Sequence, residues 1–261
     1  MIKKWISWIL ISIDKRLKLN LFQNMASKLI SENELKKYPQ FAPNGVYILS
    51  TDGKLYDPNE WAKTKDDVVC IALISDNCRF GISYTNIIAT NKSWFYDNTQ
   101  VLPGVFTDYS FQNSIYNLSK YDFNGSENTR LAIGGLLEHY RPPMPPQNGG
   151  TSYVEPEFLN DSAIGFCVSQ IFPNGKRGYM GSAGEMLEFY KNKDAILNAM
   201  KIAQGVSRIP PFDNNGIYWT STQISETEAC GVDFSSGGIL TKINKATIND
   251  IYYALPFIKL Y

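Results

Sequence analysis

The side chains best suited to chemistry in this chain are polar and aromatic groups in its C-terminal part. The run Y-W-T-S-T-Q, Tyr218–Gln223, places an indole ring beside three hydroxyl groups and an amide. Large aromatic rings offer an apolar contact surface, and hydroxyl and amide groups both donate and accept hydrogen bonds. Such groups suit the recognition of polar ligands such as sugars. We predict a ligand-binding face formed by Trp219, Ser221, Gln223, Asp233, Asn249 and Tyr252.

Trp219 has a second interpretation, as a core residue. Tyr218 and Trp219 come just before a hydroxyl-rich run that is expected to pair as a strand, and this placement favours core packing. Ser221, Thr222 and Gln223 would then be exposed hydrogen-bonding groups, or caps of the next turn.

Few residues have the pattern of a catalytic centre. No phosphate-binding glycine loop and no G-x-S-x-G sequence is present, which argues against nucleotide enzymes and serine hydrolases. His139 is the only histidine, so a histidine-based triad or metal site is not expected. The four cysteines include no C-x-x-C pair, which excludes zinc-ribbon and thioredoxin sites. We expect buried free thiols at the four positions, while a disulfide stays an open alternative: Cys70, Cys78, Cys167 and Cys230.

The acidic residues give no clear enzyme signature either. Glu155-Pro156-Glu157 lacks the asparagine and the Trp-Asn-Asp sequence of a calcium-dependent sugar site. Carboxyl pairs for glycoside hydrolysis could include Glu185, Glu188, Asp161 or Asp233, but the sequence does not fix their separation. Glu185 is better explained as a helix cap. We therefore predict a non-enzymatic protein with no cofactor and no metal ion.

The composition indicates a folded chain that does not bind nucleic acid. Hydrophobic residues make up 44% of the 261 residues and charged residues 19%, enough for a large core. Lys plus Arg and Asp plus Glu number 25 each, without the basic excess that phosphate contacts require. The chain also has 16 Tyr, 14 Phe and 5 Trp, a composition typical of recognition surfaces and equally of β-rich cores.

The first 43 residues are expected to form a separate helical attachment segment and linker. Trp5–Ile13 is apolar behind two lysines but too short to span a bilayer. It is interpreted as an assembly helix that docks on a partner, as a poor signal or anchor, or as an extension upstream of a start at Met25. Ser31–Lys37 carries a capping box for a short helix, and Tyr38–Pro43 is interpreted as a linker.

The elements that would position the binding face follow from Asn44 onward. Val46–Leu49, Leu55–Tyr56, Val68–Ser75 and Arg79–Ser83 have strand patterns, with Val68–Ser75 as a buried central strand. Residues 84–125 and the proline-rich 141–150 are expected to be loops. Helices are expected from Ser126 to about His139 and over Asp161–Gln170.

The C-terminal third alternates helix and strand signals. A capping box at Ser182–Glu185 should open one helix with a single apolar stripe that ends at Gly205. Ala229–Phe234 and Ile239–Asn244 should form a hairpin, and Ile251–Ile258 a last strand. Together these patterns predict an α+β protein.

Gly178–Met186 reads G-Y-M-G-S-A-G-E-M, Phe172–Lys176 reads F-P-N-G-K, and Tyr218–Thr222 reads Y-W-T-S-T. Together with Pro256-Phe257, these motifs resemble one family, the C-type-lectin-fold proteins of Bacteroides and their phages. The corresponding sequences of that family are G-Y-L-P-S-A-G-E-W, F-P-N-G-K, Y-W-S-S-T and a terminal R-P-F. Further similar stretches lie upstream, at Gly45–Tyr56 and Ile74–Phe80. The chain departs from the pattern at Gly181, Met186 and Leu255, where the family has Pro, Trp and Arg.

The resemblance implies a C-type-lectin-like domain over residues 44–261, with two or three helices packed on short antiparallel sheets. The fold is shared with formylglycine-generating enzymes and with the variable proteins of diversity-generating retroelements. The enzymes' reactive cysteine pair is missing, since Cys230 stands alone near the C-terminal end.

The expected function is a receptor- or glycan-binding module of a phage virion fibre or adhesin. The expected partners are a bacterial surface glycan or protein, further copies of the chain, and virion subunits that contact residues 1–43. The expected location is the virion surface, or alternatively the bacterial surface or the medium. A structural virion protein is the second hypothesis, and a glycan depolymerase the third.

Overall fold

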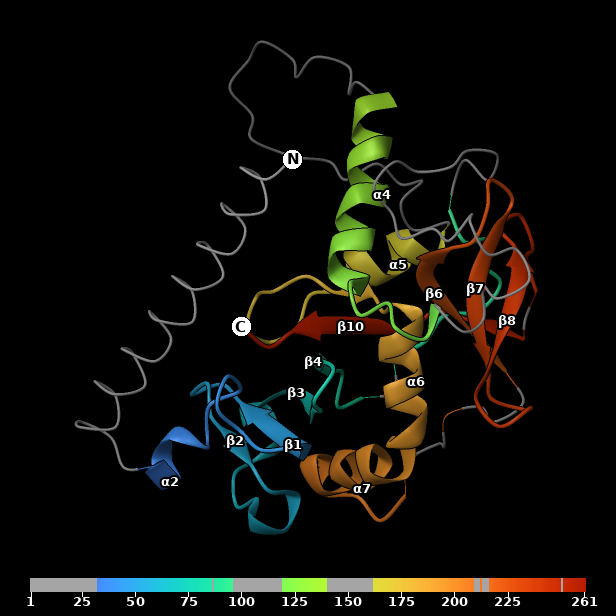
Figure 1. Ribbon diagram of the computed structural model, residues 1–261. Coiled ribbons are helices and arrows are strands. Elements are labelled where there is room, and N and C mark those ends of the chain that lie inside the picture. The colour runs from blue at the N-terminus through green and yellow to red at the C-terminus, as the bar shows by residue number, and fades with distance from the viewer. Residues whose placement is uncertain are drawn as a thin grey trace, which may run out of the picture.

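The computed structural model describes residues 32–85, 87–95, 119–139, 162–208, 212, 216–249 and 251–261. In this part of the chain, helices pack beside two largely antiparallel sheets, so the predicted α+β class is confirmed (Figure 1). The predicted assembly helix at Trp5–Ile13, the proline-rich loop 141–150 and Glu155-Pro156-Glu157 lie outside the described residues. No described helix has the length and apolarity needed to cross a membrane.

The larger sheet has six strands, and every neighbouring pair is antiparallel. Its order is β2 (Leu55–Tyr56), β1 (Gly45–Ser50), β3 (Val68–Ile74), β4 (Arg79–Ile82), β10 (Pro256–Lys259) and β5 (Tyr179–Met180). The four strands predicted in the N-terminal part are confirmed. Every residue of β3 is buried, as its continuous apolar run predicted.

The smaller sheet has four strands: β8 (Ile239–Asn244), β7 (Glu228–Asp233), β6 (Ile217–Gln223) and β9 (Tyr252–Tyr253). The hairpin of β7 and β8 confirms the sequence pattern, whereas the single last strand predicted over Ile251–Ile258 is wrong. That segment is divided between β9, which runs parallel to β6, and β10, which lies in the other sheet. Between them, Ala254 and Leu255 are buried as the chain passes from one sheet to the other.

The described α-helices are α2 (Glu32–Leu35), α4 (Gly125–His139), α5 (Ala163–Ser169), α6 (Ala183–Lys191) and α7 (Lys193–Gln204), with short 3-10 helices at Pro58–Glu60 and Lys65–Asp67. The single helix predicted over 182–205 is wrong, because Asn192 divides it into α6 and α7. The Asn192 side chain donates to the carbonyl of Glu188 at 2.9 Å and closes the end of α6. The chain then turns sharply, so the apolar residues of both helices reach the same core (Figure 1).

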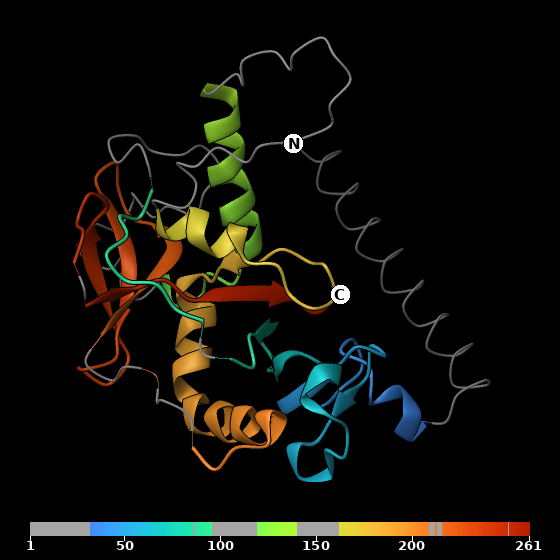
Figure 2. The same cartoon turned by 180° about the vertical axis from the view of Figure 1, so that it is seen from behind.

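Strand β10 lies at the centre of the larger core. The ring of Phe257 stacks on Phe80 with centroids 4.3 Å apart, and it also contacts Tyr179 and Phe189. The view from behind shows β10 between α4 and α5 on one side and β4 on the other (Figure 2). The C-terminal strand therefore joins elements from widely separated parts of the sequence.

Residues just before Asn44 also contact the larger sheet. Arg79 donates hydrogen bonds to the carbonyls of Pro39 at 2.5 Å and Ala42 at 3.2 Å, and Ala42 is buried. The backbone N–H of Leu55 donates to the carbonyl of Lys37 at 2.6 Å. The stretch interpreted as a linker is thus held against the sheet.

The four cysteines are free and buried, as the sequence predicted. Burial raises the pKa of each of the four thiols, and those of Cys78 and Cys230 reach about 12. All four groups are protonated at neutral pH, so none is an activated nucleophile.

Candidate ligand-binding site

The structure places Trp219 in the core and away from solvent. Its side chain is fully buried, its indole N–H donates to the carbonyl of Lys92 at 3.1 Å, and its ring packs near Tyr252 with centroids 5.5 Å apart. A buried indole cannot stack on a sugar, so the core interpretation of Trp219 is the one that the structure supports.

Ser221, Thr222 and Gln223 are buried too, and the prediction that they are exposed hydrogen-bonding groups is wrong. Gln223 accepts a hydrogen bond from the ammonium group of the buried Lys245 at 2.6 Å. Ser221 lies 3.4 Å from the side-chain nitrogen of Asn128. Their polar atoms bond within the protein, so they contribute to the fold.

These hydroxyl groups belong to a buried network centred on Asp122. Its carboxyl group accepts hydrogen bonds from Thr222 at 2.6 Å, Asn128 at 2.9 Å and the backbone N–H of Asn124 at 3.0 Å. Its carbonyl oxygen accepts from the Ser182 hydroxyl at 2.6 Å. The network fastens β6 to the start of α4 and to the start of α6.

The other three predicted site residues are partly or fully exposed. Asp233 accepts hydrogen bonds from the hydroxyl and backbone groups of Ser235 and Ser236. Burial alone would raise the pKa of Asp233, but these hydrogen bonds outweigh burial, and the pKa lies below its ordinary value. The Asn249 side chain accepts from the backbone of Ile251 at 3.1 Å. Asp233 and Tyr252 pair with Ile217 from opposite sides, so they lie at one end of the smaller sheet. Ligand binding by these three residues stays a prediction.

Two cavities lie elsewhere, beside the larger sheet. The smaller cavity has a volume of about 350 Å³, within the range of small-molecule sites. It is formed by the turn between β3 and β4, the first turn of α4, the start of α6 and the C-terminal end of β10. Its lining residues are Asn77, Cys78, Arg79, Phe123, Asn124, Ser126, Glu127, Tyr179, Glu185, Lys259, Leu260 and Tyr261.

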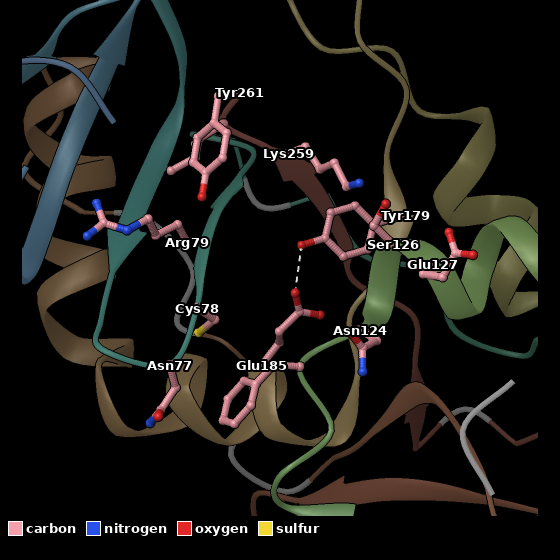
Figure 3. A pocket seen from close by; sticks show the side chains of 12 residues that line it. Asn77, Cys78, Arg79, Asn124, Ser126, Glu127, Tyr179, Glu185, Lys259 and Tyr261 are labelled. Carbon is pink, nitrogen blue, oxygen red and sulfur yellow. Dashed lines mark hydrogen bonds between the residues drawn. The ribbon is translucent and has the colours of Figure 1, made fainter. Parts of the chain in front are cut away.

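The carboxyl group of Glu185 lies at the floor of the smaller cavity (Figure 3). It accepts hydrogen bonds from the Tyr179 hydroxyl at 3.0 Å and from the Ser182 backbone at 2.9 Å, the second being half of the capping box predicted from the sequence. Burial is the main influence on its pKa and raises it to about 7, against the lowering effect of these hydrogen bonds. Glu185 therefore changes its charge near neutral pH.

Tyr179, the hydrogen-bond partner of Glu185 in the smaller cavity, keeps its proton at neutral pH. Burial and the neighbouring Glu185 raise the pKa of Tyr179 well above its ordinary value. Arg79 points away from the cavity, toward the backbone oxygens that it contacts, and the Tyr261 hydroxyl points into the cavity (Figure 3). The cavity thus offers a titrating carboxyl group, hydroxyl groups, amides and aromatic rings.

A larger cavity of about 770 Å³ adjoins the smaller one, since the two share Ser126, Tyr179, Lys259 and Tyr261. One face of α4 forms one wall of the larger cavity, because the lining residues that belong to α4 recur at helical spacing. The end of α5 and the segment before β5 form the opposite wall of this cavity. The remaining lining residues are Thr129, Arg130, Ile133, Val168, Lys176, Arg177 and Gly178.

Sequence reasoning missed these cavities, apart from considering Glu185 as a possible acid. The strand residues Tyr179 and Lys259 come together because β5 and β10 are neighbours, and this pairing is not visible in either segment alone. The strand patterns Val68–Ser75 and Arg79–Ser83 imply a turn between them, but only as a connection between strands. No local pattern indicated that it borders a cavity.

No protein-family model and no curated protein sequence matches the chain. Among solved structures, the chain is similar to a fimbrial protein from Bacteroides ovatus, with 14% identity and a TM-score of 0.45. The similarity covers 83% of this chain and 48% of that protein, so the chain spans about half its length. These values are too low to assign a shared fold.

Proposed function

We propose that this chain is a non-catalytic saccharide-binding domain, displayed on a phage fibre or on a bacterial surface adhesin, with a C-type-lectin-like scaffold. The observation that carries the proposal is the smaller cavity. It combines groups that donate and accept hydrogen bonds with the exposed ring of Tyr261, and it has the volume of a small-molecule site. Sugars present hydroxyl groups and apolar C–H faces, and this lining complements both.

The rigid support of the cavity is consistent with binding. The Tyr179 hydroxyl donates a hydrogen bond to the Glu185 carboxyl group, which also accepts one from the backbone N–H of Ser182. Preformed sites lose less conformational entropy when a ligand binds. The motifs shared with lectin-fold proteins support the same function, although the site proposed here lies away from Trp219.

The test is binding by the full 261-residue chain to a saccharide array and to whole bacteria. We expect binding to a subset of surface saccharides, and Tyr261→Ala should weaken it tenfold or more by removing the exposed ring. Tyr121→Ala is the matched control, because Tyr121 is 64% exposed, Tyr261 is 60% exposed, and Tyr121 lines neither cavity. Folded protein that binds no saccharide and no bacterium would overturn the proposal.

The attachment role of residues 1–43 is tested separately. Deletion of residues 1–24 should abolish incorporation into particles or appendages and leave saccharide binding intact. Loss of both properties would argue against a modular adhesin. Incorporation that persists after the deletion would remove the attachment role.

Glycan cleavage is a second candidate function, favoured by one observation. Two carboxyl groups whose pKa values are shifted in opposite directions line the smaller cavity. Burial raises the pKa of Glu185 to about 7, and the hydrogen bond from Arg130 lowers the pKa of Glu127. Paired carboxyl groups in different environments can act as acid and base in glycoside hydrolysis. Release of reducing ends from host polysaccharide, lost in Glu185→Gln, would establish this function in place of the first.

A further inference from the structure

The two cavities differ in the charge of their linings. The smaller one includes the acidic Glu127 and Glu185, whereas no aspartate or glutamate is found among the described residues that line the larger one. The larger cavity is instead lined by four cationic side chains, those of Arg130, Lys176, Arg177 and Lys259. They come from α4, from the segment before β5, and from β10.

Two of these cations donate long hydrogen bonds to backbone carbonyl groups. Lys176 donates to the carbonyl of Lys259 at 3.4 Å, and Arg177 donates to the carbonyl of Val168 at 3.5 Å. Within the described part of the chain, no carboxylate lies within salt-bridge distance of Lys176 or Lys259, although the charge of Lys259 helps to lower the pKa of Glu127.

Arg130 differs, because its guanidinium group pairs with Glu127 through two hydrogen bonds of 2.7 and 2.8 Å. Both residues are largely exposed, so this pair is screened by water and salt. Glu127 lines only the smaller cavity. The pair therefore stands at the border of the two cavities, and the positive charge of the larger one comes chiefly from Lys176 and Lys259.

Resting on the proposed saccharide-binding function, we infer that the ligand is an acidic saccharide whose anionic group occupies the larger cavity. Cations clustered around a concave surface attract anions, and charge-assisted hydrogen bonds are stronger than neutral ones. Lys259 and Tyr261 line both cavities, so one ligand can contact both. Its neutral ring lies against the hydroxyl and amide groups of the smaller cavity.

The lining also favours a saccharide over a bare anion or a nucleic acid. Ile133, Val168 and the ring of Tyr261 share the larger cavity with the cations, and an apolar surface matches the C–H face of a sugar ring. The chain has equal numbers of acidic and basic residues, without the basic excess that contacts with a phosphate backbone require.

The test compares trigalacturonate with uncharged trigalactose by titration calorimetry on the full chain. We expect trigalacturonate to bind at least tenfold more tightly in 20 mM salt and to lose this advantage in 500 mM salt. Lys176→Gln and Lys259→Gln should each weaken trigalacturonate several-fold and change trigalactose little. Lys65→Gln, at an exposed lysine that lines neither cavity, should change neither.

The outcomes separate this inference from the proposed function. Equal affinity for the two sugars, or lysine variants that weaken both equally, would overturn the inference and leave saccharide binding intact. Binding of neither sugar, together with no binding on a wider array, would overturn both. Titration with sulfated trigalactose shows whether the site prefers a carboxylate or a sulfate group. If free sulfate inhibits binding as strongly as trigalacturonate does, the cavity is a simple anion site and the inference is overturned.

Discussion

At the scale of single residues, the polar side chains of β6 have structural roles that their residue types alone do not predict. Ser221, Thr222 and Gln223 look like a polar binding surface, yet they are buried and bonded to Asn128, Asp122 and Lys245. A buried polar group costs free energy unless it is paired. These side chains are retained inside the protein because partners elsewhere in the chain satisfy them.

Glu185 should make stability depend on pH. Its pKa is raised from 4.5 to about 7, so the folded state keeps a proton that the unfolded state has lost between these values. This contribution to stability is fully present below pH 4.5 and is lost as the pH rises through about 7. With ~1.4 kcal/mol per pKa unit, the loss amounts to about 3 kcal/mol.

Urea denaturation of Glu185→Gln between pH 4.5 and 8 checks this expectation. The variant should lack most of the decline, because glutamine does not titrate. Glu60→Gln is the control at an exposed position and should keep the wild-type profile. An unchanged slope in Glu185→Gln would show that Glu185 is not the group responsible.

Thr222 should be important for stability although it has the shape of valine. Its hydroxyl donates to Asp122 at 2.6 Å and accepts from the backbone of Ala183 at 2.9 Å. Thr222→Val leaves the N–H at the start of α6 without an acceptor and should cost about 2–4 kcal/mol in chemical denaturation. Thr241→Val, on the half-buried edge strand β8, should change stability by less than about 0.5 kcal/mol. Equal effects of the two changes would contradict the proposed network.

At the scale of elements, local sequence patterns correctly predicted features that depend on neighbouring residues, such as strands, helix caps and helix ends. The strands of residues 45–82, the Ser182–Glu185 cap and the stop at Gly205 all appear as expected. The break at Asn192 was missed because the apolar spacing continues across it. The division of 251–258 was missed because Tyr252 and Phe257 are both strand formers, and only tertiary pairing assigns them to different sheets. The two cavities depend on the same long-range pairings.

Phe257 should be the most sensitive position of β10. It contacts the rings of Phe80, Tyr179 and Phe189, which belong to three other elements. Phe257→Ala should therefore cost about 3–5 kcal/mol, measured by thermal or urea unfolding. Tyr261→Ala, two residues beyond the end of the strand and 60% exposed, should leave the unfolding midpoint nearly unchanged. A mild effect of Phe257→Ala would mean that the sheet does not depend on this strand.

At the scale of the whole molecule, the two sheets are connected to each other and to the same helices. The chain passes from β9 to β10 through two buried residues, and the Asp122 network fastens β6 to α4 and α6. Elements held by so many mutual contacts should unfold together.

Cysteine reactivity can test this cooperativity. Cys70 lies in the six-stranded sheet and Cys230 in the four-stranded sheet, and both are fully buried. In increasing urea, both should become accessible to a thiol reagent at the same midpoint, as followed by peptide mass spectrometry. Labelling of one sheet at a clearly lower urea concentration would show that the sheets unfold as separate units.

The position of β10 has a consequence for synthesis on the ribosome. The six-stranded sheet has its fifth strand inserted between β4 and β5, and Phe257 pairs with Ile82 across most of the chain. Until residue 259 has left the ribosome, the backbone hydrogen-bonding groups on the β10-facing edge of β4 have no strand partner. Such an edge can pair with other chains, so a chaperone that binds the nascent chain should raise the yield of native protein.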